Sequence, residues 1–226
     1  MTNQNKLTAV IFGSTGLTGK FLTELLIKDD RYERLVLFVR KESKVYHGKI
    51  RQVVFNPDRI EDVLPEINGD QLFCCLGTTI KKAGSQEAFY KTDHHLIVDI
   101  AKASKRNNIP VFTVISSLGA NATSKNFYLN TKGNTEEVLK SIGFKTLSIL
   151  RPSLLLGIRP ERRPLEEISK VIFKALGFVM AGKLKKYKPV HAETVAKAMI
   201  ISANGKPGLN ILESDKIEIL GSQNLQ

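Results

Sequence analysis

The chain has 226 residues, 42% hydrophobic and 25% charged, an ordinary composition for a globular protein large enough for one sizeable α/β domain. No apolar run is long enough to span a bilayer, so we expect no integral membrane contact, and the polar residues 1–6 predict no signal peptide. Cys74 and Cys75 are adjacent and would point to opposite faces of a strand, which disfavours a disulfide between them. Two unpaired thiols predict a reducing compartment, and hence a cytoplasmic location.

The net charge is +12, and ten basic against three acidic residues lie between Arg151 and Lys188. Such an excess raises the question of a nucleic-acid partner. The segment contains only Phe173, Phe178 and Tyr187 as aromatic residues, and both Phe fall in an apolar helical stretch, so we find no platform for stacking bases. We therefore expect no nucleic acid, and a basic surface near an anionic cofactor instead; the role of segment 151–188 stays open.

Strand-like and helix-like segments alternate along the chain. Apolar runs predict strands at 7–12, 35–39, 49–55, 72–76, 111–115 and 146–150. Helical periodicity predicts helices at 16–28, 59–64, 86–107 and 125–141, and then at 165–178 and 192–202, followed by a short strand at 208–212. Near-continuous apolar strands separated by helices predict an α/β fold with a doubly wound, mostly parallel sheet buried on both faces.

Three glycines spaced by three join the first predicted strand to the first predicted helix, in the run Gly13-Ser14-Thr15-Gly16-Leu17-Thr18-Gly19. The spacing differs from the better-known G-x-G-x-x-G, but its place between strand and helix is that of a pyrophosphate-binding turn. Glycine lets the backbone approach the phosphates, and the helix start offers free N–H groups and the positive end of the dipole. The segment therefore predicts dinucleotide binding by residues 13–19.

The second predicted strand is followed by Arg40 and Lys41. An NAD site usually has a carboxylate there, on the ribose 2′-hydroxyl. A guanidinium would instead pair with a 2′-phosphate, so we predict NADP (NADPH) as the cofactor, with both basic residues on its phosphate. The alternative is a solvated basic pair at a strand end.

A further candidate binding turn follows the fourth predicted strand. Leu76, Gly77, Thr78 and Thr79 come after the fourth strand and would line the adenosine and ribose, because ligands of doubly wound sheets lie beyond the carboxyl ends of the strands. A plain turn is the alternative there.

Ser116 and Ser117 end the fifth strand, and Tyr128 and Lys132 share one face of the next helix. The ammonium of Lys132 would stabilise the phenolate of Tyr128, which is otherwise a weak base at neutral pH. A serine hydroxyl would polarise a substrate carbonyl, and together with a nicotinamide these groups suffice for hydride transfer.

These motifs resemble the short-chain dehydrogenase/reductases, and in particular the atypical branch of Tat-interacting-protein-like and NmrA-like NAD(P)-binding proteins. The likeness runs over nearly the whole chain, through residues 211–213. The matching segments are 13–19, 74–79, 116–120, Tyr128 with Lys132-Gly133, and 151–156.

The resemblance implies a Rossmann-like fold, bound NADP(H), and Ser117, Tyr128 and Lys132 at the catalytic positions. It places Ser116 and Lys132 beside the cofactor, and the loop of Pro152, Ser153, Leu154 and Leu155 over the nicotinamide. Asp93 stands where many active members carry an Asn that completes a proton relay through water.

We expect one domain over residues 1–226, with a dinucleotide-binding core at 1–150 and a small substrate-side lid at 151–226. The expected function is an NADP-dependent oxidoreductase acting on a small carbonyl or alcohol. The alternative is a redox-sensing or regulatory protein that binds NADP(H) and a protein partner without turnover; an epimerase is disfavoured because there is no large substrate domain. His94 and His95 diverge on a helix, with no acidic or cysteine cluster nearby, so no metal is expected. A homodimer stays open.

Overall fold

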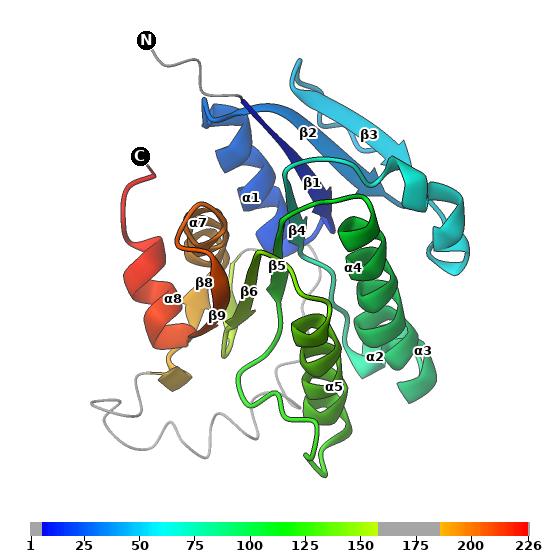
Figure 1. Cartoon of the computed structure of the whole chain (residues 1–226). Coiled ribbons are helices and arrows are strands. Elements are labelled where there is room, and N and C mark those ends of the chain that lie inside the picture. Colours follow the sequence, from blue (N-terminus) through cyan, green and yellow to red (C-terminus); the bar gives the residue numbers. More distant parts are fainter. Residues whose placement is uncertain (1–5, 158–185, 226) are drawn as a thin grey trace.

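A seven-stranded sheet forms the centre of the molecule in the computed structural model, which describes residues 6–157 and 186–225 (Figure 1). The strand order is β3-β2-β1-β4-β5-β6-β9, and every neighbouring pair is parallel. The order reverses between β1 and β4, which makes the sheet doubly wound, as predicted. The strands are β1 (Leu7–Phe12), β2 (Tyr32–Val39), β3 (Ile50–Val54), β4 (Gln71–Cys74), β5 (Val111–Ile115), β6 (Thr146–Arg151) and β9 (Gly208–Glu213).

Helices cover both faces of the sheet, so successive strand residues enter two separate cores. In β1, Val10 and Phe12 pack into one core, whereas Ala9 and Ile11 pack into the other. The first core is closed by α4 (Leu96–Arg106), α5 (Phe127–Ser141) and the 3₁₀ segment η1 (Pro57–Glu66). The second is closed by α1 (Leu17–Lys28), α7 (Ala192–Ala203) and α8 (Ser214–Gly221).

The long helix predicted over 86–107 contains a change of helix type. It begins as α3 (Gln86–Tyr90), widens into one π-helical turn, η2 (Lys91–His95), and continues as α4. The periodicity of apolar residues does not reveal such a turn, because the buried face continues on both sides of it. The other elements that the sequence did not predict are α2 (Ile80–Ala83), α8, and a two-stranded parallel pair of β7 (Leu155–Leu156) with β8 (Val190–His191).

The segment 151–226, expected to form a lid, also completes the sheet and one of its covering layers. Strand β9 pairs with β6, and α7 packs against the second core through Val195 and Met199. The helix predicted at 165–178 lies outside the described residues. The lid over the substrate side therefore stays a prediction.

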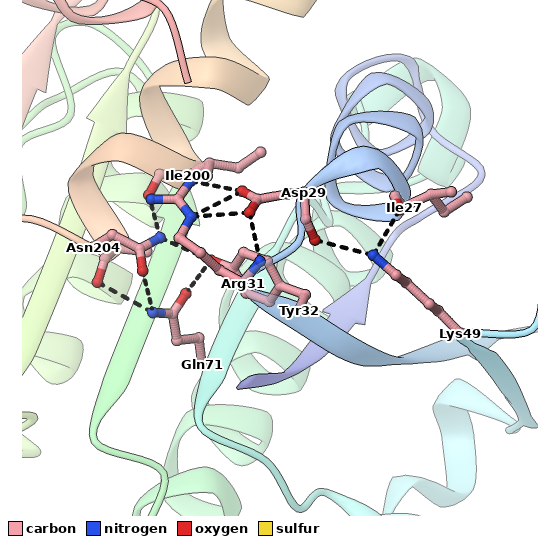
Figure 2. Close-up of polar contacts among 9 residues, drawn as sticks. Ile27, Asp29, Arg31, Tyr32, Lys49, Gln71, Ile200 and Asn204 are labelled. Atoms are coloured by element: carbon pink, nitrogen blue, oxygen red, sulfur yellow. Dashed lines mark hydrogen bonds and ion pairs between the residues drawn. The ribbon is translucent and has the colours of Figure 1, made fainter. Parts of the chain in front are cut away.

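A buried polar network fixes α7 to the amino ends of the strands (Figure 2). The Tyr32 hydroxyl lies 2.7 Å from Gln71 Oε1 and accepts a hydrogen bond from Asn204 Nδ2 at 2.8 Å. Burial raises the pKa of Tyr32 to about 12, so the hydroxyl stays protonated well beyond neutral pH. Nearby, Lys49 Nζ donates to the carbonyl oxygens of Ile27 and Asp29, at the carboxyl end of α1 (Figure 2). Hydrogen bonds thus tie α7, β2 and β4 together at the amino ends of the strands.

Candidate functional site

The carboxyl ends of β1, β4, β5 and β6 lie along the edge opposite the polar network, because the strands are parallel. The reversal of strand order between β1 and β4 falls on this edge. In open α/β sheets such a reversal opens a crevice in which ligands bind. The segments singled out from the sequence all follow these strands or the neighbouring β2.

The glycine loop after β1 requires glycine at two positions. Gly13 has a φ of +81°, and a Cβ there would lie 2.8 Å from the carbonyl carbon and oxygen of Cys75, beyond β4. A Cβ on Gly19 would lie 2.1 Å from the carbonyl oxygen of Gly13, inside the loop itself. The amide of Gly16 donates to the same oxygen at 3.0 Å. The loop is therefore folded tightly against the start of α1 and the end of β4.

Two hydroxyls in this loop are buried and have no partner among the described residues. Ser14 and Thr18 are 6% and 4% exposed, and neither side-chain oxygen has a hydrogen-bond partner in the described part of the chain. Helix α1 begins beside them with no side-chain cap and no acidic residue in its first turn. Buried hydroxyls normally have partners, and an uncapped helix start favours an anion. The chemistry of this cradle suits a phosphate, and phosphate binding by residues 13–19 stays a prediction.

Arg40 and Lys41 follow β2 directly, and both are exposed. Neither forms an ion pair among residues 6–157 and 186–225. Their side chains are therefore available to an anionic group beyond β2.

The turn after β4 lies against α3–α4. Thr78 donates its backbone N–H to Asp93 Oδ2 at 2.9 Å, and the Thr79 hydroxyl caps α2 by accepting from the amide of Lys82 at 3.1 Å. Gly77 is exposed and lies beside both Asp93 and Lys132, since a Cβ on it would be 3.6 Å from Asp93 Oδ1 and 3.8 Å from Lys132 Nζ. Leu76 packs against the first core.

The two serines after β5 have different surroundings. Ser116 is buried, and its hydroxyl donates to Glu136 Oε1 of α5 at 2.5 Å. Glu136 also receives the guanidinium of Arg151, at the end of β6. Ser117 is half-buried, and among the described residues its hydroxyl makes a single long contact of 3.4 Å, to the carbonyl oxygen of Leu118. Ser116 is thus committed to an internal network, whereas Ser117 is available to a ligand.

Helix α5 carries Tyr128 and Lys132 one turn apart, as the spacing predicted, but the partner of Lys132 differs. Tyr128 is half-buried, with its ring 5.5 Å from that of Phe89. Lys132 is 5% exposed, and its Nζ lies 2.6 Å from Oδ1 of Asp93, which is 0% exposed. Burial lowers the pKa of Lys132, but the charge of Asp93 and its hydrogen bond to the ammonium act in the opposite direction, and the pKa is raised overall. The expected pairing with Tyr128 is therefore shared with a carboxylate.

The loop after β6 lies against the serine turn. Pro152 accepts from the amide of Leu118 at 3.0 Å, and the amide of Ser153 donates to Ser214 Oγ at 2.7 Å. The carbonyl of Leu154 accepts from Val190 at 2.9 Å, and Leu155 begins β7. These bonds hold residues 152–155 at the same edge as Ser117.

The sequence assigned Tyr128, and not Asp93, as the partner of Lys132, and it gave Glu136 no role. The signal for Glu136 was present, since it lies four residues beyond Lys132 and so on the same face of α5. For Asp93 the family resemblance marked the position, where many members carry an Asn, but gave no contact with Lys132, because the direction of the side chain depends on the π-helical turn.

Comparison with known proteins gives the family. The family described as NAD(P)H-binding matches residues 13–168. Protein HTATIP2 of Rattus norvegicus is 31% identical over 225 residues, covering 96% of this chain and 90% of that protein. The protein named "fmp52, mitochondrial" of Emericella nidulans is 40% identical over 201 residues, covering 84% of each chain.

Solved structures share the fold. WbmH of Bordetella bronchiseptica, solved with NAD⁺, has a TM-score of 0.71 at 17% identity, over 96% of this chain and 80% of that one. UDP-glucose 4-epimerase of Thermotoga maritima has a TM-score of 0.69 at 14% identity, over 91% and 76%. At this identity the likeness shows the fold alone, and it confirms the Rossmann-like prediction.

One prediction is wrong. Several fungal relatives are named as mitochondrial proteins, among them those of Emericella nidulans and Candida albicans, which contradicts the cytoplasmic location. The inference failed because free thiols at Cys74 and Cys75 do not identify a compartment. Among the described residues, no helix is both long and apolar enough to cross a membrane.

The fold, the glycine cradle and these relatives agree on one assignment. The chain belongs to the NAD(P)H-binding family and, within it, to the atypical, NmrA-like short-chain dehydrogenase/reductases.

Proposed function

We propose that this protein is an NADP(H)-dependent oxidoreductase that interconverts a small carbonyl compound and its alcohol. One observation carries the proposal: Ser14 and Thr18 present buried, partnerless hydroxyls, within the described part of the chain, beside the uncapped start of α1. A pyrophosphate would supply the acceptors that these hydroxyls and the free N–H groups lack. Gly13 and Gly19 leave the space that the close approach of such a group requires.

The basic pair after β2 supports NADP over NAD. Arg40 and Lys41 are exposed at the strand end where an NAD-specific site has a carboxylate. A guanidinium there would bind the 2′-phosphate through two hydrogen bonds, and the neighbouring ammonium would add to the attraction.

Three side chains would carry the chemistry. The bound nicotinamide supplies or receives the hydride. Tyr128 would exchange the proton with the substrate oxygen, and the hydroxyl of Ser117 would leave its long 3.4 Å contact with Leu118 to hold that oxygen through a hydrogen bond. Lys132 would bind the nicotinamide ribose with its ammonium, which pairs with Asp93 and lies on the same helix face as Tyr128.

Titration of the full chain with NADPH and NADH tests the cofactor. We expect NADPH to bind more tightly, and Arg40→Ala to weaken NADPH about 10- to 100-fold with little effect on NADH, because a charge-assisted bond to the 2′-phosphate is lost. The fluorescence of the bound cofactor reports binding. Lys44→Ala removes an equal charge from the exposed loop nearby and should leave both affinities unchanged. Equal weakening of NADPH and NADH by Arg40→Ala would contradict the assignment.

A turnover assay distinguishes an enzyme from a regulator that binds NADP(H) without reacting it. The regulator is the second candidate because Lys132 is already paired with Asp93. With NADPH and a panel of small aldehydes and ketones, we expect oxidation of NADPH that falls at least about 100-fold in Tyr128→Phe, while NADPH binding persists. Tyr90→Phe makes the same chemical change on the neighbouring helix α3 and should retain activity. No turnover by the unmodified protein, with cofactor bound, would favour the regulator.

A further inference from the structure

A π-helical turn directs Asp93 toward Lys132. The turn η2 interrupts a helix that otherwise runs from Gln86 to Arg106. Thr135 of α5 supports it, with its hydroxyl oxygen 2.9 Å from the carbonyl oxygen of Asp93 and 3.0 Å from His94 Nδ1. Single π-turns inside α-helices are rare and frequently lie at functional sites. Here the turn places the fully buried carboxylate of Asp93 beside the segment that follows β4.

Both oxygens of that carboxylate are used. Oδ1 lies 2.6 Å from Lys132 Nζ, and Oδ2 accepts the backbone N–H of Thr78 at 2.9 Å. Asp93 thereby joins three elements: its own helix, the turn after β4 and helix α5. The backbone of Gly77 lies beside the pair, since a Cβ added there would be in ordinary van der Waals contact with both Asp93 and Lys132. The ammonium is thus held in place independently of Tyr128.

In the described part of the chain, the carboxylate of Asp93 balances the charge of Lys132. The titratable groups that act on it are Asp93 from η2, Tyr128 from α5 and Cys74 from β4. Burial raises the pKa of the Cys74 thiol to about 12, so it is uncharged. The raised pKa of Lys132 keeps the ammonium protonated. A buried ion pair at this distance acts on a third group largely as a dipole, and therefore far more weakly than a lone ammonium.

We propose that Asp93 is a positioning residue of the site: its carboxylate fixes the Lys132 ammonium against the turn after β4 and, by balancing its charge, keeps Tyr128 a proton donor at neutral pH. The proposal rests on the function proposed above and deepens it, since a protonated Tyr128 serves carbonyl reduction rather than alcohol oxidation. An asparagine at position 93 would occupy the same space but would leave the ammonium unbalanced.

Ionisation of Tyr128 is directly measurable in the protein without cofactor. The chain has five Tyr and no Trp, so phenolate absorption on titration is free of indole background. The difference between the unmodified chain and Tyr128→Phe isolates Tyr128, and Tyr32 titrates only near its own pKa of about 12. We expect Asp93→Asn to move the midpoint of Tyr128 down by about one pH unit or more, because the unbalanced ammonium stabilises the phenolate. An unchanged midpoint would overturn the proposal.

Two variants complete the test. Asp93→Asn combined with Lys132→Met removes both charges. This double variant should return the midpoint of Tyr128 to that of the unmodified protein. A rise of about one unit would mean that, in the unmodified protein, Asp93 does not balance the effect of the Lys132 charge on Tyr128. The double variant decides the matter if Asp93→Asn alone does not fold, as circular dichroism would reveal. Asp99→Asn, on α4, removes a carboxylate six residues along the chain and should leave the midpoint unchanged. No cofactor is used, so failure here is distinct from failure to bind NADPH.

Discussion

Gly19→Ala should destabilise the protein by roughly 3–5 kcal/mol and abolish measurable NADPH binding. The added Cβ would lie 2.1 Å from the carbonyl oxygen of Gly13 and 2.9 Å from Cα of Ser14. These are backbone atoms, so no side-chain rotation relieves the clash, and the loop must move away from α1. The hydroxyl of Ser14 and the N–H groups at the start of α1 would then no longer point toward one and the same phosphate. Thermal unfolding measures the first effect and cofactor fluorescence the second.

Gly48→Ala is the matched control. Nothing lies within 4 Å of a Cβ at that position, in the loop before β3. This substitution should leave stability within about 0.5 kcal/mol and NADPH affinity unchanged. If Gly19→Ala behaved like Gly48→Ala, the loop would not be held tightly against α1, and the argument for a preformed phosphate cradle would fail.

The parts of the site that follow strand ends were predictable from the sequence. Residues 13–19, Arg40 and the serine pair each follow an apolar run, and a parallel sheet brings the ends of such runs to one edge. Tyr128 and Lys132 were predictable as a pair because their spacing fixes their common helix face. These inferences need only chain order and the geometry of regular elements.

The polar partners inside the site were not predictable. Asp93 reaches Lys132 only because one helical turn widens, and apolar periodicity is insensitive to a single extra residue in a turn. Strand patterning alone does not separate Ser116 from Ser117; the family resemblance favoured Ser117, and the bond of Ser116 to the carboxylate of Glu136 shows how their surroundings differ. A glutamate on a helix is usually solvated, so the sequence predicts an exposed Glu136. Its burial is understood only from the structure, in which Arg151 of β6 pairs with it.

Glu136→Gln should lower the free energy of unfolding by about 3 kcal/mol, near the lower end of what breaking a buried ion pair costs, because Arg151 keeps some access to water. Glu136 is 1% exposed, accepts from the Ser116 hydroxyl and pairs with the guanidinium of Arg151. The bond to Glu136 raises the pKa of Arg151, so the guanidinium stays charged and is left unpaired when the carboxylate becomes an amide. For a chain of this size, such a loss lowers the melting temperature by roughly 6–12 °C.

Glu137→Gln makes the identical change one position along α5. Its side chain is 62% exposed and forms an ion pair with Lys140, so the melting temperature should hardly move, because surface ion pairs contribute little. A lower melting temperature for Glu136→Gln than for Glu137→Gln would show that the buried Glu136 supports the serine turn, whereas Glu137 is an ordinary surface charge on the same helix. Equal melting temperatures for the two variants would mean that Glu136 does not hold Ser116 and Arg151 together. The orientation of Ser117 toward a substrate would then need another source, because the backbone that carries it is joined to Ser116.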